Sequence, residues 1–171
     1  VEPVKHESSI PRYIKIINSS INSFLDVNNT KFDVVILKQV LHLLNKNERE
    51  YFYDEIKKYL HDNAKIVFIH MNNQTEIPQF PIMKKKLKES INSHQYLSEE
   101  LIKNFRLYKI ENFDYDVNIS SKEYLEMIRN RYISVILDLN EEEIEQGVEF
   151  IKKNYPYQLS FKDTLTIEIF N

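Results

Sequence analysis

Apolar residues follow two rhythms along this chain: unbroken runs typical of buried strands, and a spacing of three to four residues typical of helices. The unbroken runs are FDVVIL at 32–37 and AKIVFIH at 64–70. Between them, residues 47–60 place Phe52 and Ile56 at helical spacing. A strand, a helix and a second strand with short links predict a parallel βαβ unit, with both strands buried on both faces.

The segments around this unit predict further strands and helices. The β-branched run at 13–17 predicts a strand that ends in a polar turn. After the strand at 64–70, a polar loop broken by prolines follows in a position where α/β sheets bind ligands. Beyond this loop, the spacing predicts a basic helix near 82–91, a helix opened by a serine near 99–105, and a long strand over 106–119.

The last third of the chain predicts two helices and a strand. Ser120 and Glu123 match a capping box for a helix over 122–137. Another helix begins at Asn140, where three glutamates follow a capping side chain. The alternating run at 164–170 predicts a strand with one face in solvent.

Composition narrows the class of protein. With 171 residues, 42% hydrophobic and 29% charged, the chain is long enough for one globular core. The absence of cysteine excludes disulfides, thiolate nucleophiles and cysteine-based metal sites. A net charge of −3 gives no attraction to phosphate backbones, so we expect no nucleic-acid partner. The apolar runs are only strand-length and resemble no signal sequence, so we expect no membrane partner and a cytoplasmic location.

Glycine and histidine placement limit the kinds of site that the sequence predicts. Gly147 is the single glycine, so the chain has no glycine-rich turn of the kind that cradles phosphate groups. His6, His61 and His94 lie in polar surroundings without partners at metal-ligand spacing. We therefore predict no metal site.

The order of the segments resembles the class I S-adenosylmethionine-dependent methyltransferase family. The resemblance rests on VEP (1–3), YIKIINSSINSF (13–24), FDVVILKQVLHLL (32–44), LHDNAKIVFIH (60–70), and the tail EYLEMIRNRYISVILDLNEEEIEQGVEFIKKNYP followed by FKDTLTIEIF. It runs from the end of the family's second strand to the C-terminus.

This resemblance implies an α/β fold with a Rossmann-like methyltransferase sheet, mostly parallel with an antiparallel C-terminal strand. The family's N-terminal strand and glycine-rich loop are missing. The whole chain, 1–171, would then be a single methyltransferase-like domain, incomplete at its N-terminus, with a helical insertion at about 120–156.

The resemblance also implies a cofactor, S-adenosylmethionine, and the residues that hold it. The acid that ends the family's second strand binds the ribose hydroxyls, and Glu2 is the matching residue. The turn after the third strand contacts the adenine, and the residues just past the fourth strand lie under the methionine part. The matching positions are Asn18, Ser19, Ser20 and Ile21 for the turn, and Lys38, Gln39 and Val40 for the fourth strand.

Two histidines follow the predicted parallel strands. His42 would face the methyl acceptor as a base or hydrogen-bond donor, or else be a helix-start histidine bonded to backbone. His70 takes the equivalent place on the next strand and is a candidate for substrate binding.

A further substrate-binding group lies on the predicted helix over 122–137. Arg129, Arg131 and Tyr132 could line a pocket for an anionic acceptor. The alternative is that the arginines lie in water with their stems packed.

Two functions remain open from the sequence. The first is an S-adenosylmethionine-dependent methyltransferase, or the C-terminal portion of one, that acts on a small-molecule methyl acceptor. The second is a non-catalytic methyltransferase-like module that acts as a protein-interaction subunit. The second follows from the missing glycine-rich loop. A sheet that lacks its first strand has open edges, where a second copy or a partner chain could complete it.

Overall fold

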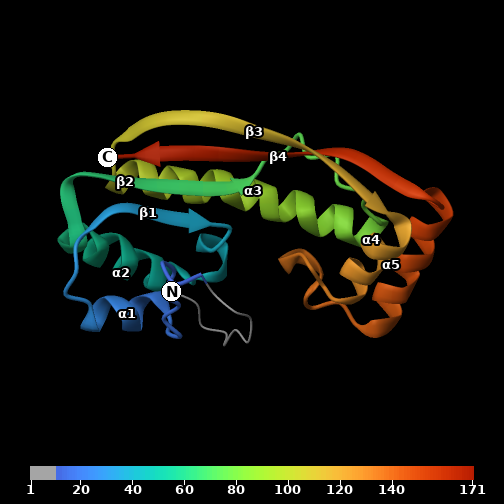
Figure 1. Cartoon of the computed structure of the whole chain (residues 1–171), viewed down its shortest axis with the longest axis horizontal. Coiled ribbons are helices and arrows are strands. Elements are labelled where there is room, and N and C mark those ends of the chain that lie inside the picture. Colours follow the sequence, from blue (N-terminus) through green and yellow to red (C-terminus); the bar gives the residue numbers. More distant parts are fainter. Residues whose placement is uncertain (1–10) are drawn as a thin grey trace.

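A four-stranded sheet with helices on one side forms the frame of the molecule (Figure 1). The computed structural model describes residues 11–171. The strands are β1 (Phe32–Lys38), β2 (Leu60–Met71), β3 (Leu107–Ser120) and β4 (Gln158–Phe170), in the order β1-β2-β4-β3. β1 and β2 are parallel, whereas β4 is antiparallel to both of its neighbours. Three strands therefore share one direction and the C-terminal strand is reversed, which confirms the expected fold class.

The predicted βαβ unit is confirmed. It consists of β1, a 3-10 turn η1 (Leu41–Leu43), helix α2 (Lys46–Ile56), a 3-10 turn η2 (Lys57–Tyr59) and β2. Asn45 begins α2 with a capping box, since its side chain accepts from the backbone of Glu48 and the Glu48 carboxylate accepts from the backbone of Asn45. The parallel register places Lys38 beside Ile69, so the two strands end at the same edge of the sheet.

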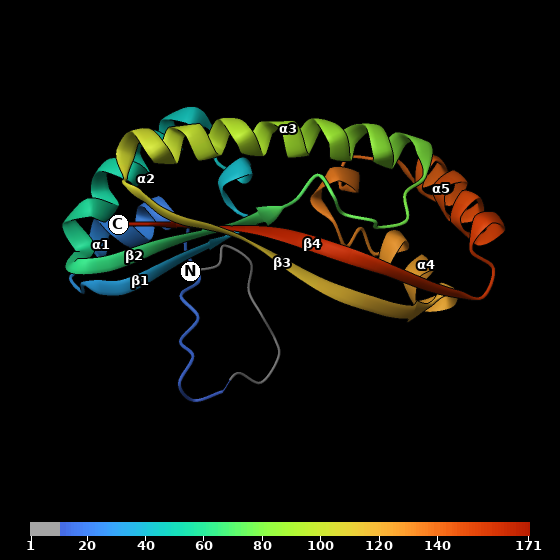
Figure 2. The ribbon, with the colours of Figure 1, turned by 90° about the horizontal axis from the view of Figure 1, so that it is seen from above.

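The expectation that β1 is buried on both faces is wrong. Val34 is 52% exposed and Ile36 is 63% exposed, whereas Leu37 on the opposite face is buried. Within residues 11–171, β1 pairs with β2 alone, and helices cover one face of the sheet (Figure 2). The unbroken apolar run therefore gives β1 one packed face and one apolar face in solvent.

The strand expected at 13–17 does not form either. Tyr13 is 87% exposed, and the backbone turns, with the Ile14 amide donating to the Pro11 carbonyl at 2.9 Å. An isolated extended segment has no ladder hydrogen bonds to stabilise it, and no described strand pairs with this one. The chain then enters helix α1 (Ile21–Val27), which Ser20 caps by accepting from the Ser23 amide.

One long helix, α3 (Pro81–Asn104), replaces the two helices expected near 82–91 and 99–105. Neither glycine nor proline occurs between those segments, so nothing interrupts the helix. Its 24 residues span about 36 Å along the sheet (Figure 2). The residues that α3 buries form a stripe at helical spacing: Met83, Leu87, His94, Leu97 and Leu101.

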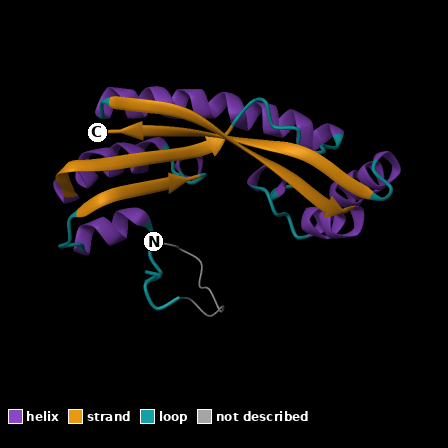
Figure 3. Cartoon of the chain, turned by 45° about the horizontal axis from the view of Figure 1, so that its top comes forward, coloured by secondary structure: helices purple, strands orange, loops and turns teal. Residues whose placement is uncertain are grey.

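The C-terminal helices cover the far ends of β3 and β4, which extend beyond β1 and β2 (Figure 3). Helix α4 (Ser121–Arg129) begins with the predicted capping box, and helix α5 (Glu141–Asn154) begins with a second one at Asn140. The helix expected over 122–137 is shorter than predicted, because Arg131 adopts a positive φ of 51°. A 3-10 turn, η3 (Ser134–Ile136), follows.

Two apolar cores lie along α3. One joins α1, α2, β1 and β2 to the C-terminal half of α3 through residues such as Phe52, Phe68 and Leu101. The other joins α4 and α5 to the N-terminal half of α3 through residues such as Phe80 and Val148. Burial of each such aliphatic or aromatic side chain contributes about 1.5–3 kcal/mol to the free energy of folding. The two cores therefore stabilise both halves of α3.

Gly147 is explained by close packing. A Cβ atom at this position would lie 2.8 Å from three ring atoms of Phe80, which is itself buried. Glycine in α5 therefore lets the helix approach Phe80.

We predict that Gly147→Ala destabilises the protein by about 1–3 kcal/mol through overpacking, although alanine favours an isolated helix by about 1 kcal/mol. Urea unfolding measures the change. In a Phe80→Leu background the same substitution should cost much less, because the smaller side chain leaves room for the methyl group. An alanine variant that is more stable than the parent would contradict this explanation.

Candidate functional site

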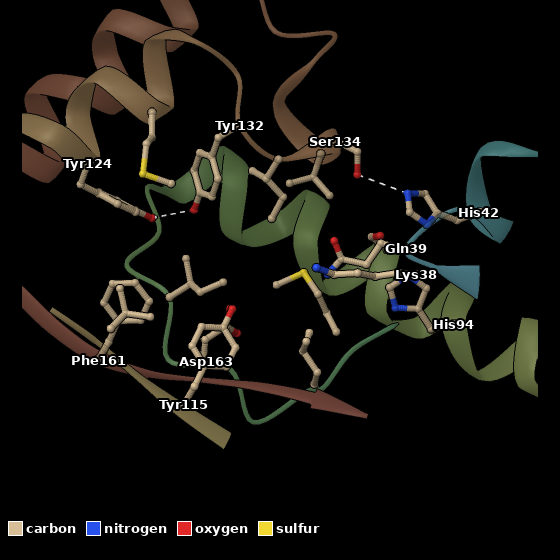
Figure 4. A pocket seen from close by; sticks show the side chains of 18 of the residues that line it. Lys38, Gln39, His42, His94, Tyr115, Tyr124, Tyr132, Ser134, Phe161 and Asp163 are labelled. Atoms are coloured by element: carbon tan, nitrogen blue, oxygen red, sulfur yellow. Dashed lines mark hydrogen bonds between the residues drawn. The ribbon is translucent and has the colours of Figure 1, made fainter. Parts of the chain in front are cut away.

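A cavity of about 450 Å³ lies between the two cores (Figure 4). The end of β1, α3, β3, β4 and the α4 to η3 region all contribute to its walls. Its polar and aromatic lining consists of Lys38, Gln39, His42, Ser90, His94, Tyr115, Tyr124, Tyr132, Ser134, Phe161 and Asp163. The remaining lining is aliphatic or methionine, so a few polar groups face a mostly apolar space, as in many small-molecule sites.

The end of β1 turns sharply into the cavity. Gln39 adopts a φ of 51°, a conformation that costs a non-glycine residue about 1–2 kcal/mol. Its amide still donates to the Ile69 carbonyl at 2.9 Å, so the strained turn stays attached to β2. The turn brings Lys38, Gln39 and His42 to one wall, and strain of this kind is concentrated at functional sites.

Three histidines form a row beside this wall. The ring centre of His94 lies 5.5 Å from that of His42 and 5.2 Å from that of His70. His42 and His94 line the cavity, whereas His70 lies behind them, buried against Phe68.

His70 belongs to a buried polar network. Its Nδ1 lies 3.1 Å from the Met71 carbonyl, which is an acceptor. Its Nε2 lies 3.2 Å from Oε1 of Glu168, and the Ser98 hydroxyl donates to Glu168 Oε2 at 2.7 Å. Both neighbours of the ring are acceptors, so a neutral His70 donates to one of them, according to its tautomer.

His94 differs from its neighbours because it is buried without a hydrogen bond of normal geometry. The residue is 3% exposed, and neither ring nitrogen has a hydrogen-bond partner among the described residues. Burial lowers the pKa of His94 to about 4; His70 and His42 act in the same direction and the Met71 backbone opposes them. A buried polar group without a partner costs about 1–3 kcal/mol, so His94 is neutral at pH 7 and energetically unfavourable where it lies.

His42 joins the two sides of the cavity. Its Nε2 lies 3.3 Å from the Ser134 hydroxyl, so the loop after β1 contacts the η3 segment (Figure 4). Burial lowers the pKa of His42, which keeps its imidazole neutral at pH 7 and able to accept a proton.

Aromatic side chains form the opposite end of the cavity (Figure 4). Tyr124 donates to the Pro78 carbonyl at 2.6 Å, and its hydroxyl lies 3.0 Å from that of Tyr132. Tyr115 donates to Asp163 at 2.5 Å. Burial raises the pKa of Tyr132 and that of Tyr115 to about 12. These hydroxyls are neutral and paired, so this end presents mainly ring surface.

A second hollow, of about 520 Å³, follows the outer edge of β1. The cofactor residues expected from the sequence divide between the two hollows. Lys38 and Gln39 line the cavity, together with His42 and Tyr132. The residues at the second hollow, named here the β1 groove, include Ser19, Ser20, Ile21 and Val40. Asn18 precedes them in the chain, and Glu2 lies outside the described residues.

The two candidate arginines lie outside the lining of the cavity. Arg129 pairs with Glu145 at 2.9 Å, and Arg131 pairs with Glu141 at 2.7 Å. Arg131 also donates to the Leu139 carbonyl at 3.1 Å. These contacts link the α4 region to α5, so both arginines have a structural role in this part of the fold.

Sequence reasoning missed His94, Tyr115 and Asp163 as lining residues. His94 was expected in polar surroundings, because the helix around it was divided into two. Its spacing from Leu87 and Leu101, seven residues on either side, places it on the buried stripe of a continuous helix. Tyr115 and Asp163 meet through the antiparallel pairing of β3 with β4, which no local pattern reveals.

Comparisons with known proteins support the fold. No protein-family model matches the chain. A solved structure described as "a Putative Type II Methyltransferase" from Anaeromyxobacter dehalogenans is 11% identical, with a TM-score of 0.53, over 95% of this chain and 74% of that one. This chain therefore has the same fold as that protein.

Two further similarities are weaker. One is an S-adenosylmethionine-dependent methyltransferase from Thiobacillus denitrificans, solved with S-adenosyl-L-homocysteine. It is 10% identical, and the match covers 84% of this chain and 61% of that one. Its TM-score of 0.37 is too low to support an argument. "Potassium channel K2" of Plasmodium berghei is 27% identical over 97 residues, or 56% of this chain. The matched region spans 7% of the length of that protein, so it does not establish a family.

Two features are absent from residues 11–171. No helix there is both long and apolar enough to cross a membrane. No group of three or more His, Asp or Glu side chains in the same range is arranged to hold a metal ion.

We predict that the free energy of unfolding falls as the pH is lowered from about 6.5 towards 4, in part because of His94. In this window the unfolded chain binds a proton at His94 and the folded chain does not, so stability is fully present above the unfolded pKa and is lost towards the folded pKa of about 4. Urea unfolding at several pH values measures the slope.

His94→Phe should flatten this slope, whereas His61→Phe, at an exposed position on β2, should leave it unchanged. Equal slopes in the parent and His94→Phe would show that His94 titrates normally.

Proposed function

We propose that the chain is an S-adenosylmethionine-dependent methyltransferase, or the C-terminal portion of one, that acts on a small molecule. The observation that supports this most strongly is that the β1 groove and the cavity meet at the segment after β1. Leu43 lines both hollows, and Val40 lines the groove while Gln39 and His42 line the cavity. A cofactor in one hollow would therefore lie next to an acceptor in the other.

The described residues of the β1 groove suit the nucleoside part of the cofactor. Its lining is apolar, including Phe24 and Phe32, with the hydroxyls of Ser19 and Ser20, and no charged side chain lines it. An adenine ring requires such an apolar slot with a few hydrogen-bonding groups. In this proposal Ile21 and Val40 contact the adenosine together with the serines.

The methionine part of the cofactor would lie at the turn after β1. Lys38 and Gln39 are the polar side chains at this turn that face the cavity, and Lys38 can pair with a carboxylate. Glu2, which would hold the ribose, is part of the same proposal. The glycine-rich loop of the resembling family has no counterpart among these residues.

The cavity would hold the methyl acceptor. When bound, the cofactor supplies a methyl group on a positively charged sulfur, and the carbon–sulfur bond breaks as the methyl carbon bonds to the acceptor. An oxygen or nitrogen acceptor that carries a proton must lose it, and the neutral His42 is placed to take that proton. The apolar walls exclude water, and Tyr132 helps to orient the acceptor.

Three other candidates have supporting places in this proposal. His70 lies behind His94 and fixes that side of the wall through its contact with Glu168. Arg129 and Arg131 hold the α4 region against α5 and so shape the cavity indirectly.

A second candidate function is that of a non-catalytic module that binds another protein chain. The exposed apolar side chains of β1, Val34 and Ile36, favour it, because an unpaired strand edge with apolar neighbours is a template for strand addition. Size-exclusion chromatography with light scattering tests self-association. A monomer at all concentrations that binds the cofactor product would count against this candidate.

We predict that S-adenosyl-L-homocysteine binds the chain and that Val40→Trp weakens this binding at least tenfold by filling the β1 groove. Isothermal titration calorimetry measures both affinities. Val27→Trp is the matched control, because Val27 is 81% exposed and does not line the groove. Absence of binding to the parent chain, or equal effects of the two tryptophans, would contradict the proposed cofactor site.

A further inference from the structure

Of the three histidines beside the cavity, two have a hydrogen-bond partner and one has none. His70 has an acceptor within hydrogen-bond distance of each ring nitrogen, the Met71 carbonyl and Glu168. His42 contacts Ser134. His94 lies between them, lines the cavity and is nine-tenths or more buried (Figure 4). The Met71 backbone raises its pKa, but the Met71 carbonyl lies 3.1 Å from His70 Nδ1, and neither ring nitrogen of His94 forms a hydrogen bond of normal geometry with a described residue. A ligand group that bonds to His94 would satisfy the one unpaired imidazole of the row.

The hydrogen-bonding capacity of His94 indicates which functional group of a ligand it can bind. A neutral imidazole offers one donor and one acceptor, which a hydroxyl group can match with either role. It provides no positive charge to balance a carboxylate, and no negative charge to balance an ammonium group. The group that His94 recognises is therefore uncharged.

The aromatic residues at the far end of the cavity indicate the shape of the rest of the ligand. Tyr124 packs edge-on against Tyr132, with ring centres 5.8 Å apart, and against Phe161, with ring centres 6.2 Å apart. The hydroxyls of Tyr124 and Tyr132 bond to each other, so these residues offer ring surface to a ligand. Flat aromatic molecules pack well against such surfaces.

The charged residue at this end is already satisfied. Asp163 accepts from the Thr75 hydroxyl at 2.7 Å and from the Tyr115 hydroxyl at 2.5 Å. It therefore needs no cation from the ligand. Lys38, the charged residue at the other end, is exposed, and in the proposed function it pairs with the carboxylate of the cofactor rather than with the acceptor.

We propose that the cavity binds an uncharged hydroxyaromatic molecule, with its hydroxyl on His94 and its ring against Tyr124, Tyr132 and Phe161. This inference rests on the proposed function, since it names the class of methyl acceptor. His94 acts in it as a recognition residue, and His42 keeps the proton-accepting role.

Three naphthalene probes test the proposal with the whole chain at pH 7.5, by equilibrium dialysis without cofactor. The probes are 2-naphthol, which has the hydroxyl, naphthalene, which lacks it, and 2-naphthoate, which is an anion. We expect 2-naphthol to bind about five- to tenfold more tightly than naphthalene, as a net hydrogen bond provides. Equal binding of these two probes, or tighter binding of 2-naphthoate than of 2-naphthol, would overturn the proposal.

Substitutions then locate the hydroxyl. His94→Phe should reduce 2-naphthol binding to the level of naphthalene and leave naphthalene binding nearly unchanged, whereas His61→Phe should alter neither. A preference for 2-naphthol that survives in a folded His94→Phe variant would overturn the assignment to His94. The comparison of probes on the parent chain remains decisive where the variant fails to fold.

Titration with S-adenosyl-L-homocysteine separates this inference from the proposed function. If 2-naphthol binds through His94 but the cofactor product does not bind, the hydroxyaromatic site is supported and the proposed methyltransferase function is rejected. Binding of the cofactor product without a preference for 2-naphthol would retain the methyltransferase and reject this acceptor class.

Discussion

The packing of α3 across both apolar cores is the constraint on which the rest of the structure depends. Leu97 and Leu101 fix its C-terminal half to the βαβ unit, and Met83 and Leu87 fix its N-terminal half to α4 and α5. Between these anchors α3 packs through His94 against His42 and His70, and the cavity lies beside this row. The position of His94, midway along α3, follows from the same geometry, because it lies on the buried stripe where the two cores separate.

The parallel pairing of β1 with β2 supplies the other side of the site. It sets Lys38 beside Ile69, and the positive φ of Gln39 then directs the chain towards α3. The β1 groove and the cavity thus lie on either side of one short segment. A methyltransferase requires such an arrangement, since a donor and an acceptor must be held next to each other while water is excluded. The fold shared with the Anaeromyxobacter protein is consistent with this, although the fold alone assigns no chemistry.

Local patterns predicted the parts of the structure that local physics controls. The βαβ unit and the helix starts at Ser120 and Asn140 follow from apolar spacing and capping side chains. The patterns failed where neighbours distant in sequence decide the outcome. Residues 13–17 have strand-forming side chains but no described strand to pair with, and β1 is apolar on a face that no described element covers. His94 and Asp163 became visible as lining residues only once α3 and the β3–β4 pairing placed them.

Amide chemical shifts from a ¹⁵N-labelled chain titrated with S-adenosyl-L-homocysteine test the central claim most directly, because they report where the ligand lies. If the cofactor lies along β1, the largest changes will occur at residues 19–21, in the groove, and at residues 38–43, in the turn between the groove and the cavity. An unchanged spectrum, or changes confined to α4 and α5, would contradict the account.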